Sequence, residues 1–450
     1  MPVFMERSPM TADPRSRSTR GEAALAAAVI ALAAVLAPAI ALADGGTPKL
    51  DTGDTAWMLV SSAFVLFMTP GLALFYGGMV HRRNVLSTFM FVHFALALIT
   101  VQWVVVGYSL AFGKSHAGLI GGLDLALLRT VTGERGTIPH LAFMAFQMKF
   151  AIITPALIAG AFVERMRFAA YVVFALLWTT LVYDPVAHWT WGEGGWLARL
   201  GVLDFAGGTV VHLTAGIAAL VCALVIGPRA GYPHHRSLPH NLTMTVTGGG
   251  LLWFGWFGFN AGSALGANNL AALAFCTTHV SAGAAALAWV LAEWFHRRRP
   301  TMLGFVSGLV AGLVCITPAA GFVSVAAALL MGTAAGAVCY LAVMQKERLG
   351  YDDSLDAFGV HGVGGMLGAL LTGVFSQKSL NPAGADGLLA GNARQLGLQA
   401  LGVVVAGAYA ALLTYVILKL TNLVVRLRVT PEEETEGLDA SQHGEAGYSM

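Results

Sequence analysis

Eleven apolar stretches, each about as long as a bilayer is thick, recur along this 450-residue chain. A helix needs about 20 consecutive apolar residues to cross a membrane. In lipid, only helices and closed barrels satisfy all of their backbone hydrogen bonds internally, so the stretches predict an all-α integral membrane protein with eleven transmembrane helices. They lie near 55–80, 86–112, 141–163, 168–187, 206–227, 241–264, 271–293, 301–320, 322–345, 355–375 and 396–424.

The composition fits a chain that has lipid as its main solvent. Charged residues make up 11% of the sequence, against about 25% in soluble domains. The net charge of +2 is too small to indicate a nucleic-acid partner. The cysteines lie in apolar stretches without metal-ligand spacing and are expected to be small packing residues; they are Cys222, Cys276, Cys315 and Cys339.

Residues 1–43 have the pattern of a secretory signal. Arg15, Arg17 and Arg20 precede the run AALAAAVIALAAVLAPAIALA, which ends in small residues suited to cleavage after Ala43. We therefore expect a cleavable bacterial signal peptide at 1–43, with an uncleaved anchoring helix as the alternative. The membrane domain is expected at 44–425 and a C-terminal tail at 426–450.

Every second loop between the apolar stretches is rich in arginine and lysine, which marks the cytoplasmic side. This pattern predicts a multi-pass protein of the bacterial inner membrane, with the mature N-terminus outside and the C-terminus in the cytoplasm. The tail is acidic and polar, so it is expected to be flexible by itself and to offer a site for a cytosolic partner. The basic residues are Arg82, Arg83, Arg165, Arg167, Arg229, Arg236, Arg297, Arg298, Arg299, Lys346, Arg348, Arg426 and Arg428.

Two histidines lie inside apolar stretches, where an ionisable ring is costly. The first ten stretches form two five-helix halves of opposite direction, and the last helix of each half carries one of them, His212 or His361. Such inverted repeats meet near the middle of the membrane. We expect the two rings to meet there, neutral and joined by a hydrogen bond between ring nitrogens. Ordinary packing or a metal site are the alternatives, but no carboxylate or cysteine lies one helical turn from either ring.

Aromatic residues recur on the same helix faces as this expected interior. Phe146 and Phe150 share one face, as do Trp256 and Phe259, and Ser263 follows one turn later. Trp191 is expected in an outer loop. A small cation over such rings gains about 0.5–2 kcal/mol, although core packing or an interfacial belt would also explain them.

Three further polar residues fall at the ends of the apolar stretches. Asp204 and Asp356 stand before helices and are expected to be N-caps. Lys149, next to Phe150, is expected to extend to the outer surface, because facing the aromatic residues it would repel a cation.

Several longer motifs together resemble the ammonium transporter/Rh superfamily, and within it the bacterial ammonium transporters. The resemblance covers nearly the whole mature chain and keeps the family's order of motifs. The motifs are PGLALFYGGMVHRRNVLS, FQMKFAIITPALIAGAFVERMRF, PVAHWTWG, LDFAGGTVVH, GWFGFNAGS, DDSLDAFGVHGVGG and EEETEGLDASQHGEAGY.

The resemblance implies roles for the residues already singled out. Phe150, Trp191 and Ser263 would form an outer ammonium site flanked by Phe146, and Phe150 with Phe259 would gate a central pore. His212 and His361 would stand in that pore, with Trp256 lining it and Tyr76 toward its inner end. Asp204 would lie below the outer site, and Asp353 with Asp356 would mark the matching region of the second half.

The resemblance also implies a homotrimer with one pore per subunit and a PII-class regulator at the cytoplasmic face. No enzyme activity, cofactor or metal is expected. The expected function is ammonium transport: the ion loses its proton at the gate, ammonia passes the histidines, and the proton moves separately. Methylammonium would serve as an analogue. The alternatives are an Rh-like gas channel, an ammonium sensor that signals through its tail, and an intramembrane metalloenzyme.

Overall fold

The computed structural model describes residues 50–234 and 238–448, and the predicted signal peptide lies outside them. Within these residues long helices are joined by short turns. The α-helices are α2 (Thr52–Met79), α3 (Val85–Gln102), α4 (Tyr108–Phe112), α5 (His140–Ile158), α6 (Phe168–Trp178), α7 (Asp184–Trp191), α8 (Trp196–Leu200), α9 (Thr214–Ile226), α10 (Leu242–Ala261), α11 (Asn269–Arg297), α12 (Met302–Ile316), α13 (Val325–Gln345), α14 (Val363–Phe375), α15 (Ala393–Val424), α16 (Pro431–Glu436) and α17 (Leu438–His443).

Shorter segments extend or connect these helices. The 3-10 turns are η2 (Arg82–Asn84), η4 (Ala126–Leu128), η5 (Ala159–Ala161), η8 (Gly262–Ala264) and η10 (Leu388–Ala390). The π-helical segments are η3 (Trp103–Gly107), η6 (Thr179–Tyr183), η7 (Gly208–Leu213) and η9 (Phe358–Gly362). Strands β1 (Ser115–His116) and β2 (Ile120–Gly121) form one antiparallel hairpin, and β3 (Glu134–Arg135) and β4 (Ile138–Pro139) form another.

In the described part of the chain, nine helices are long and apolar enough to cross a membrane. The remaining two predicted stretches contain α10 and α12, of 20 and 15 residues, which are not among the nine. The predicted all-α architecture is therefore confirmed, while the crossing of the membrane by eleven helices stays a prediction. Large apolar side chains cover the outward surface of the bundle, as lipid contact requires; Leu59, Leu330 and Val404 are 55%, 57% and 65% exposed.

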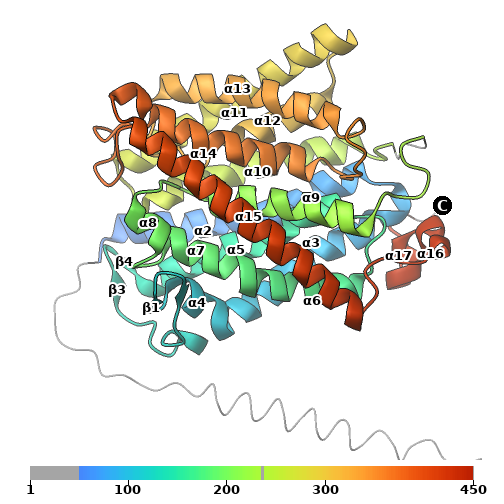
Figure 1. Cartoon of the computed structure of the whole chain (residues 1–450), viewed down its shortest axis with the longest axis horizontal. Helices are drawn as coiled ribbons and strands as arrows, with labels where there is room; N and C mark the ends of the chain where they lie inside the picture. Colours follow the sequence, from blue (N-terminus) through green and yellow to red (C-terminus); the bar gives the residue numbers. More distant parts are fainter. Residues whose placement is uncertain (1–49, 235–237, 449–450) are drawn as a thin grey trace, which may run out of the picture. The chain divides into compact units, whose positions relative to one another are not determined.

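The two ends of the helical bundle differ in what covers them (Figure 1). The hairpins β1–β4 lie at one end, here called the hairpin end, and α16 with α17 lie at the other, here called the tail end. Helix α15 crosses the face formed by α6, α9 and α14, and packs on all three. A ligand that passes through the bundle along its helices would therefore travel between these two ends.

Corresponding helices of the two predicted halves pack against each other. The first helices, α2 and α10, are in close contact, because a Cβ on Gly248 would stand 2.3 Å from the amide nitrogen of Phe75. The last helices also meet, since α9 packs on η9 and α14 packs on η7. Glycines permit such close backbone approach. This pairing is what an inverted repeat would produce, and the repeat itself stays a prediction.

The expectation of a flexible tail is wrong. Helix α16 begins with a capping box in which Thr430 and Glu433 exchange hydrogen bonds. In α17, the carboxylate of Asp439 accepts the Ser87 amide at 2.7 Å, and Leu438 is fully buried. The acidic composition suggested a solvated segment, but the carboxylates find backbone and arginine donors at the tail end, and these contacts hold the segment in place.

Candidate functional site

The structure brings the two intramembrane histidines together. His212 lies in η7 and His361 in η9, and the side chains are buried. Their ring centroids are 5.3 Å apart and their planes differ by 16°. The approach depends on small residues, because a Cβ on Gly216 would stand 2.0 Å from the amide nitrogen of Gly362.

The expected hydrogen bond between the two rings is not formed. Both nitrogens of His212 and Nδ1 of His361 lack a hydrogen-bond partner among the described residues. The ring of His212 instead packs against Trp256, at 5.2 Å and 19°, and against Phe259 at 5.9 Å. Ring packing therefore sets the orientation of His212. Buried polar atoms without a partner are unusual, and here they remain free to bind a small polar ligand.

A narrow central cavity of about 10 Å³ surrounds the two histidines. That space corresponds to roughly one water-sized molecule. Its wall is apolar apart from the histidine rings, because the Trp256 indole donates its hydrogen bond to Thr317 at 2.9 Å. The lining residues are Met68, Leu72, Phe75, Ile153, Leu157, His212, Leu252, Trp256, Phe259, Val310 and His361.

Tyr76 does not line the central cavity, and its place toward the inner end of the pore stays a prediction. Its hydroxyl donates to the carbonyl of Leu157 at 3.0 Å, and the side chain is buried. The neighbouring residue on α2, Phe75, lines the cavity instead. Successive residues of a helix point about 100° apart, which is why Phe75 meets this cavity and its neighbour Tyr76 does not.

A pair of stacked phenylalanines separates the central cavity from a second cavity. Phe150 and Phe259 have ring centroids 4.1 Å apart and planes 29° apart. Phe150 lines the second cavity, whereas Phe259 lines the central one. Phe146 packs on Phe150 from the side, at 4.9 Å. Passage between the two cavities therefore requires the stacked pair to move.

The second cavity has a volume of about 190 Å³ and is here called the hairpin-end cavity. Trp191 is the last residue of α7, not a loop residue as expected, and its ring meets Phe150 edge-on at 6.0 Å. Ser263 donates to the Phe259 carbonyl at 2.8 Å, so its oxygen lone pairs remain available as acceptors. The lining residues are Arg135, Phe143, Gln147, Phe150, Trp191, Phe205, Ser263 and Leu265.

Sequence reasoning missed five of these lining residues, among them Phe143. The side-chain oxygen of Gln147 is buried without a partner. The helical spacing of Phe143, Gln147 and Phe150, which places them along one face of α5, is a signal that would have identified it. Arg135, Phe205 and Leu265 lie outside the long helices, where the sequence offers no periodicity to read.

Asp204 anchors the start of the helical segment that carries His212. Its two carboxylate oxygens accept four backbone amides at 2.7–3.0 Å, those of Gly207, Gly208, Thr209 and Val210. Asp204 was expected at the N-cap itself, but the N-cap position is Gly207, and the Asp204 side chain caps the segment from three residues earlier. The Asp204 carbonyl also accepts the indole N–H of Trp191 at 2.9 Å, which ties the hairpin-end cavity to the histidine segment.

In the second half, the anchoring acid is Asp353 and not Asp356. Asp353 accepts the Phe358 amide at 2.7 Å, and it precedes His361 by eight residues, as Asp204 precedes His212. Asp356 was expected to cap this helix but has a φ of 61°, outside the geometry of an N-cap, and it pairs with Lys346. The two histidine segments are thus held by acids at the same spacing.

Lys149 is half-buried, with its ammonium 3.8 Å from the sulfur of Met148, and it does not line the hairpin-end cavity. Within residues 50–234 and 238–448, no three histidine, cysteine or acidic side chains are grouped to hold a metal ion. Cys276 is exposed, whereas the other cysteines are buried as free thiols.

Comparison with known proteins decides the family, because the sequence model of the Ammonium Transporter Family matches residues 56–448. The chain belongs to the ammonium transporter family. An "Ammonium transporter" of Bacillus subtilis (strain 168) is 50% identical over 404 residues, 89% of this chain and 99% of that protein. Its relatives are thus named as transporters, and family membership with several apolar spans makes this chain a multi-pass membrane protein that transports ammonium or ammonia.

Solved structures have the same fold. The crystal structure of Saccharomyces cerevisiae Mep2 has a TM-score of 0.81 and 37% identity, covering 85% of this chain and 89% of that one. A structure titled "Sensor Amt Protein" has a TM-score of 0.81 and 32% identity, covering 87% of this chain and 98% of that one.

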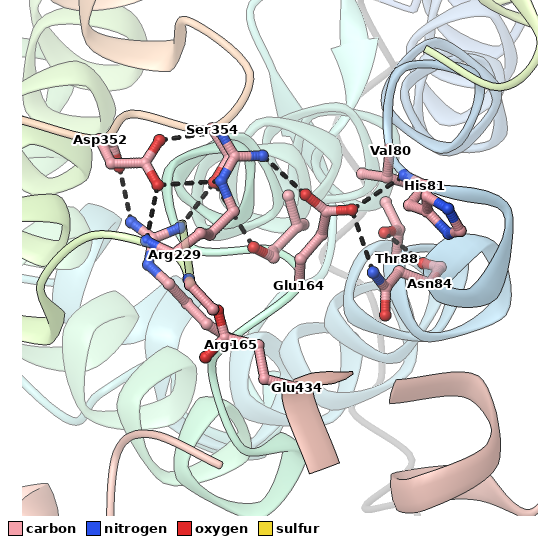
Figure 2. Close-up of polar contacts among 12 residues, drawn as sticks. Val80, His81, Asn84, Thr88, Glu164, Arg165, Arg229, Asp352, Ser354 and Glu434 are labelled. Atoms are coloured by element: carbon pink, nitrogen blue, oxygen red, sulfur yellow. Dashed lines mark hydrogen bonds and ion pairs between the residues drawn. The ribbon is translucent and has the colours of Figure 1, made fainter. Parts of the chain in front are cut away.

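An ion-pair network links several loops at the tail end of this transporter (Figure 2). Arg229 lies between Asp352, at 2.8 Å, and Glu164, at 2.6 Å. Glu164 also accepts the Asn84 amide group at 3.0 Å. Figure 2 shows these side chains converging from four separate loops and helix ends. A tail-end cavity of about 490 Å³ borders the network.

The tail of this family member joins the same network. Glu434 of α16 accepts the Ala230 amide at 2.7 Å and pairs with Arg428 at 2.8 Å. Asn84 in turn accepts the Leu438 amide at 2.8 Å. The contacts made by α16 and α17 therefore reach the residues that border the tail-end cavity.

Burial and charge shift the protonation equilibria of this network. Burial alone would lower the pKa of Arg229, but its hydrogen bonds and ion pairs with Asp352 and Glu164 raise that pKa overall. Burial would raise the pKa of Asp352, but the Arg229 guanidinium lowers it overall. Burial lowers the pKa of Arg165 to about 10, and its donors bind the carbonyls of Gly227 and Asp352. The Arg229–Asp352 pair is therefore charged at neutral pH.

Burial is the main cause of the pKa shift of Asp353, the residue that anchors the His361 segment. Burial raises its pKa to about 6; the neighbouring Asp356 also raises it, whereas Lys346 lowers it. Asp353 therefore titrates closer to neutrality than an ordinary carboxyl group does.

Proposed function

We propose that this transporter captures ammonium in the hairpin-end cavity, removes its proton at the Phe150–Phe259 pair, and conducts ammonia past His212 and His361 to the tail end. One observation carries the proposal: a stacked aromatic pair separates a roomy cavity with polar acceptors from a narrow apolar cavity whose free polar atoms are histidine nitrogens.

Capture depends on aromatic faces and two oxygen acceptors. The rings of Trp191 and Phe150 attract a small cation by about 0.5–2 kcal/mol. The hydroxyl oxygen of Ser263 and the unpartnered side-chain oxygen of Gln147 line the same cavity and accept N–H groups. Phe146 supports Phe150 from the side. Weak contacts of this kind suit a site that must release its ligand onward.

The central cavity favours a neutral molecule. Moving a bare ion into an apolar interior costs tens of kcal/mol by the Born estimate, so ammonium has to give its proton to solvent water on the hairpin-end side before ammonia passes the gate. Potassium has no proton to lose and is rejected for that reason. Neutral ammonia both donates and accepts hydrogen bonds, and the nitrogens of His212 and His361 are the free polar partners along its way.

The backbone holds these rings while ammonia passes. Asp204 and Asp353 fix the first turns of the two histidine segments, and Trp256 with Phe259 packs on the ring of His212. A fixed pair of rings makes no large rearrangement during conduction, which keeps the step fast.

Further parts of the proposal concern topology and assembly. The tail end would face the cytoplasm, which is supported by the arginines gathered there, among them Arg165, Arg229 and Arg428. The proposal also includes eleven membrane spans arranged in inverted five-helix halves, and a bacterial inner-membrane location with the mature N-terminus outside. It further includes a homotrimer and separate transfer of the proton. A PII-class regulator would bind at the cytoplasmic face, beside the ordered tail.

The test replaces each pore histidine and measures ammonium currents in reconstituted liposomes. His212→Ala and His361→Ala are expected to lose selective ammonium currents. His93→Ala is the matched control, because His93 is exposed on α3 and outside the cavity lining. If both pore variants conduct ammonium selectively at the normal rate, the role assigned to the histidines is wrong.

Two alternatives give different results in the same liposomes. An Rh-like gas channel would carry methylammonium-derived amine without any current. An ammonium sensor, which the similarity to the "Sensor Amt Protein" favours, would bind ammonium with little flux and report through its tail. Methylammonium uptake measured together with current separates all three.

A further inference from the structure

The hairpin-end cavity holds a positive charge where a cation is expected to bind. Arg135 is the only charged side chain that lines this cavity among the described residues. It is half-buried and comes from β3, the first strand of the second hairpin. The guanidinium of an arginine is positively charged at physiological pH.

Aromatic faces hold the guanidinium in place. Its central carbon lies 4.0 Å from the ring centroid of Phe143 and 5.5 Å from that of Phe112. Such cation–π contacts are the interactions expected to capture ammonium. Arg135 therefore already occupies the face of Phe143, one of the aromatic rings that line this cavity.

The charge stands close enough to the gate to act on it. Phe143 and Phe150 are seven residues apart on α5, which corresponds to about 10 Å along the helix. This distance is comparable to the Debye length of about 8 Å at physiological salt, and the apolar cavity wall screens less than bulk water does.

We propose that Arg135 is a resident cation of the hairpin-end cavity that sets the affinity for ammonium by repelling it. The inference rests on the proposed capture of ammonium in this cavity. Repulsion of like charges weakens the binding of ammonium at Trp191 and Phe150, so the site releases ammonium readily. The same repulsion disfavours other cations whose binding would rely on charge alone. Arg135 is thus a specificity-determining residue that does not itself bind the substrate.

A charge series at one position tests the proposal in liposomes. The half-saturating ammonium concentration is measured for Arg135→Lys, Arg135→Gln and Arg135→Glu, at low and at high salt. Coulomb repulsion over about 10 Å predicts that Arg135→Gln lowers the half-saturating ammonium concentration about three- to tenfold. Arg135→Glu should lower this concentration further. Arg135→Lys keeps the charge and stays near wild type.

The salt dependence supplies a readout that a merely structural role would not change. Added salt screens repulsion, so it lowers the half-saturating concentration of the wild type and raises that of Arg135→Glu. Lys378→Gln is the control, because it removes an exposed positive charge from the loop after α14, outside the cavity lining.

Two outcomes separate the failure of this inference from that of the proposed function. If wild type saturates with ammonium but the Arg135 series leaves affinity and salt dependence unchanged, the role of Arg135 is overturned and capture stands. If wild type shows no saturable ammonium transport, capture in this cavity is wrong. Should Arg135→Glu fail to fold, Arg135→Gln still decides the question.

Discussion

Gly216 and Gly362 meet backbone to backbone, since a Cβ on Gly216 would stand 2.0 Å from the amide nitrogen of Gly362. Gly216 follows His212 by four residues, and Gly362 follows His361 directly. The approach of the two histidine rings is therefore a consequence of two missing side chains.

Gly216→Ala tests this dependence. The added methyl group has backbone on its far side and no flexible neighbour to displace, so we expect a loss of about 1–3 kcal/mol of stability, as in other overpacked cores. Ammonium current should fall with it, because the rings are driven apart. Gly250→Ala is the control, since nothing lies within 4 Å of its Cβ position. Equal currents and melting temperatures in both variants would contradict the claim.

Trp191→Leu is expected to weaken ammonium capture. The loss of a cation–π contact worth about 0.5–2 kcal/mol raises the half-saturating concentration roughly two- to thirtyfold. The saturating current should change less than the affinity does. Trp294→Leu serves as the control, because Trp294 is 55% exposed near the end of α11, remote from the hairpin-end cavity. An unchanged affinity in Trp191→Leu would remove this residue from the site.

Asp353 is expected to make stability depend on pH. Its pKa in the folded protein is about 6, against an ordinary value of 3.8, so the folded state holds the proton more tightly. That contribution to stability is fully present below pH 3.8 and is lost as the pH rises through about 6. The difference of about two pKa units corresponds to about 3 kcal/mol. Thermal unfolding between pH 4 and 7 should show this slope in wild type, whereas Asp353→Asn should lack it.

Arg229→Met is expected to destabilise the tail end strongly. The substitution leaves the buried carboxylates of Asp352 and Glu164 without their cation, which typically costs about 3–5 kcal/mol. Unfolding in detergent measures the effect. Arg348→Met removes an exposed arginine and should change stability by about 0.5 kcal/mol or less. Similar losses of stability in Arg229→Met and Arg348→Met would show that the ion-pair network stabilises the protein no more than an exposed arginine does.

Asp439→Ala is expected to release the tail. The Ser87 amide loses its acceptor, and the turn that begins α17 loses its contact with α3. A glutamate-specific protease should then cleave within 432–436 much faster than in wild type. Glu445→Ala, at an exposed position of the same tail, should leave the cleavage rate unchanged. Rapid cleavage of the wild type itself would contradict an ordered tail.

The sequence predicted the features that depend on apolar length and on costly polar residues. The helices appear at the expected stretches, and the two histidines stand together because a buried ionisable ring has few acceptable places in a membrane. Asp204 was found by its position before a helix, and its four amide contacts explain why an acid is needed there.

The features that the sequence did not predict depend on orientation and on contacts between distant segments. Phe75 lines the central cavity, although nothing in the sequence singles it out from its neighbours on α2. Of the two acids named for the second half, Asp353 anchors the histidine segment, whereas Asp356 has a left-handed φ of 61° and pairs with Lys346, which no sequence pattern indicates. Arg135 enters the hairpin-end cavity from a hairpin whose position no local pattern reveals.

Both histidines lie in π-helical segments, Gly208–Leu213 and Phe358–Gly362. A π turn is an α turn with one surplus residue, and an added residue rotates the rest of the helix by about 100° around its axis. The widened turn therefore sets each histidine off the regular faces of its helix, and one such turn in each half directs both rings to the same cavity.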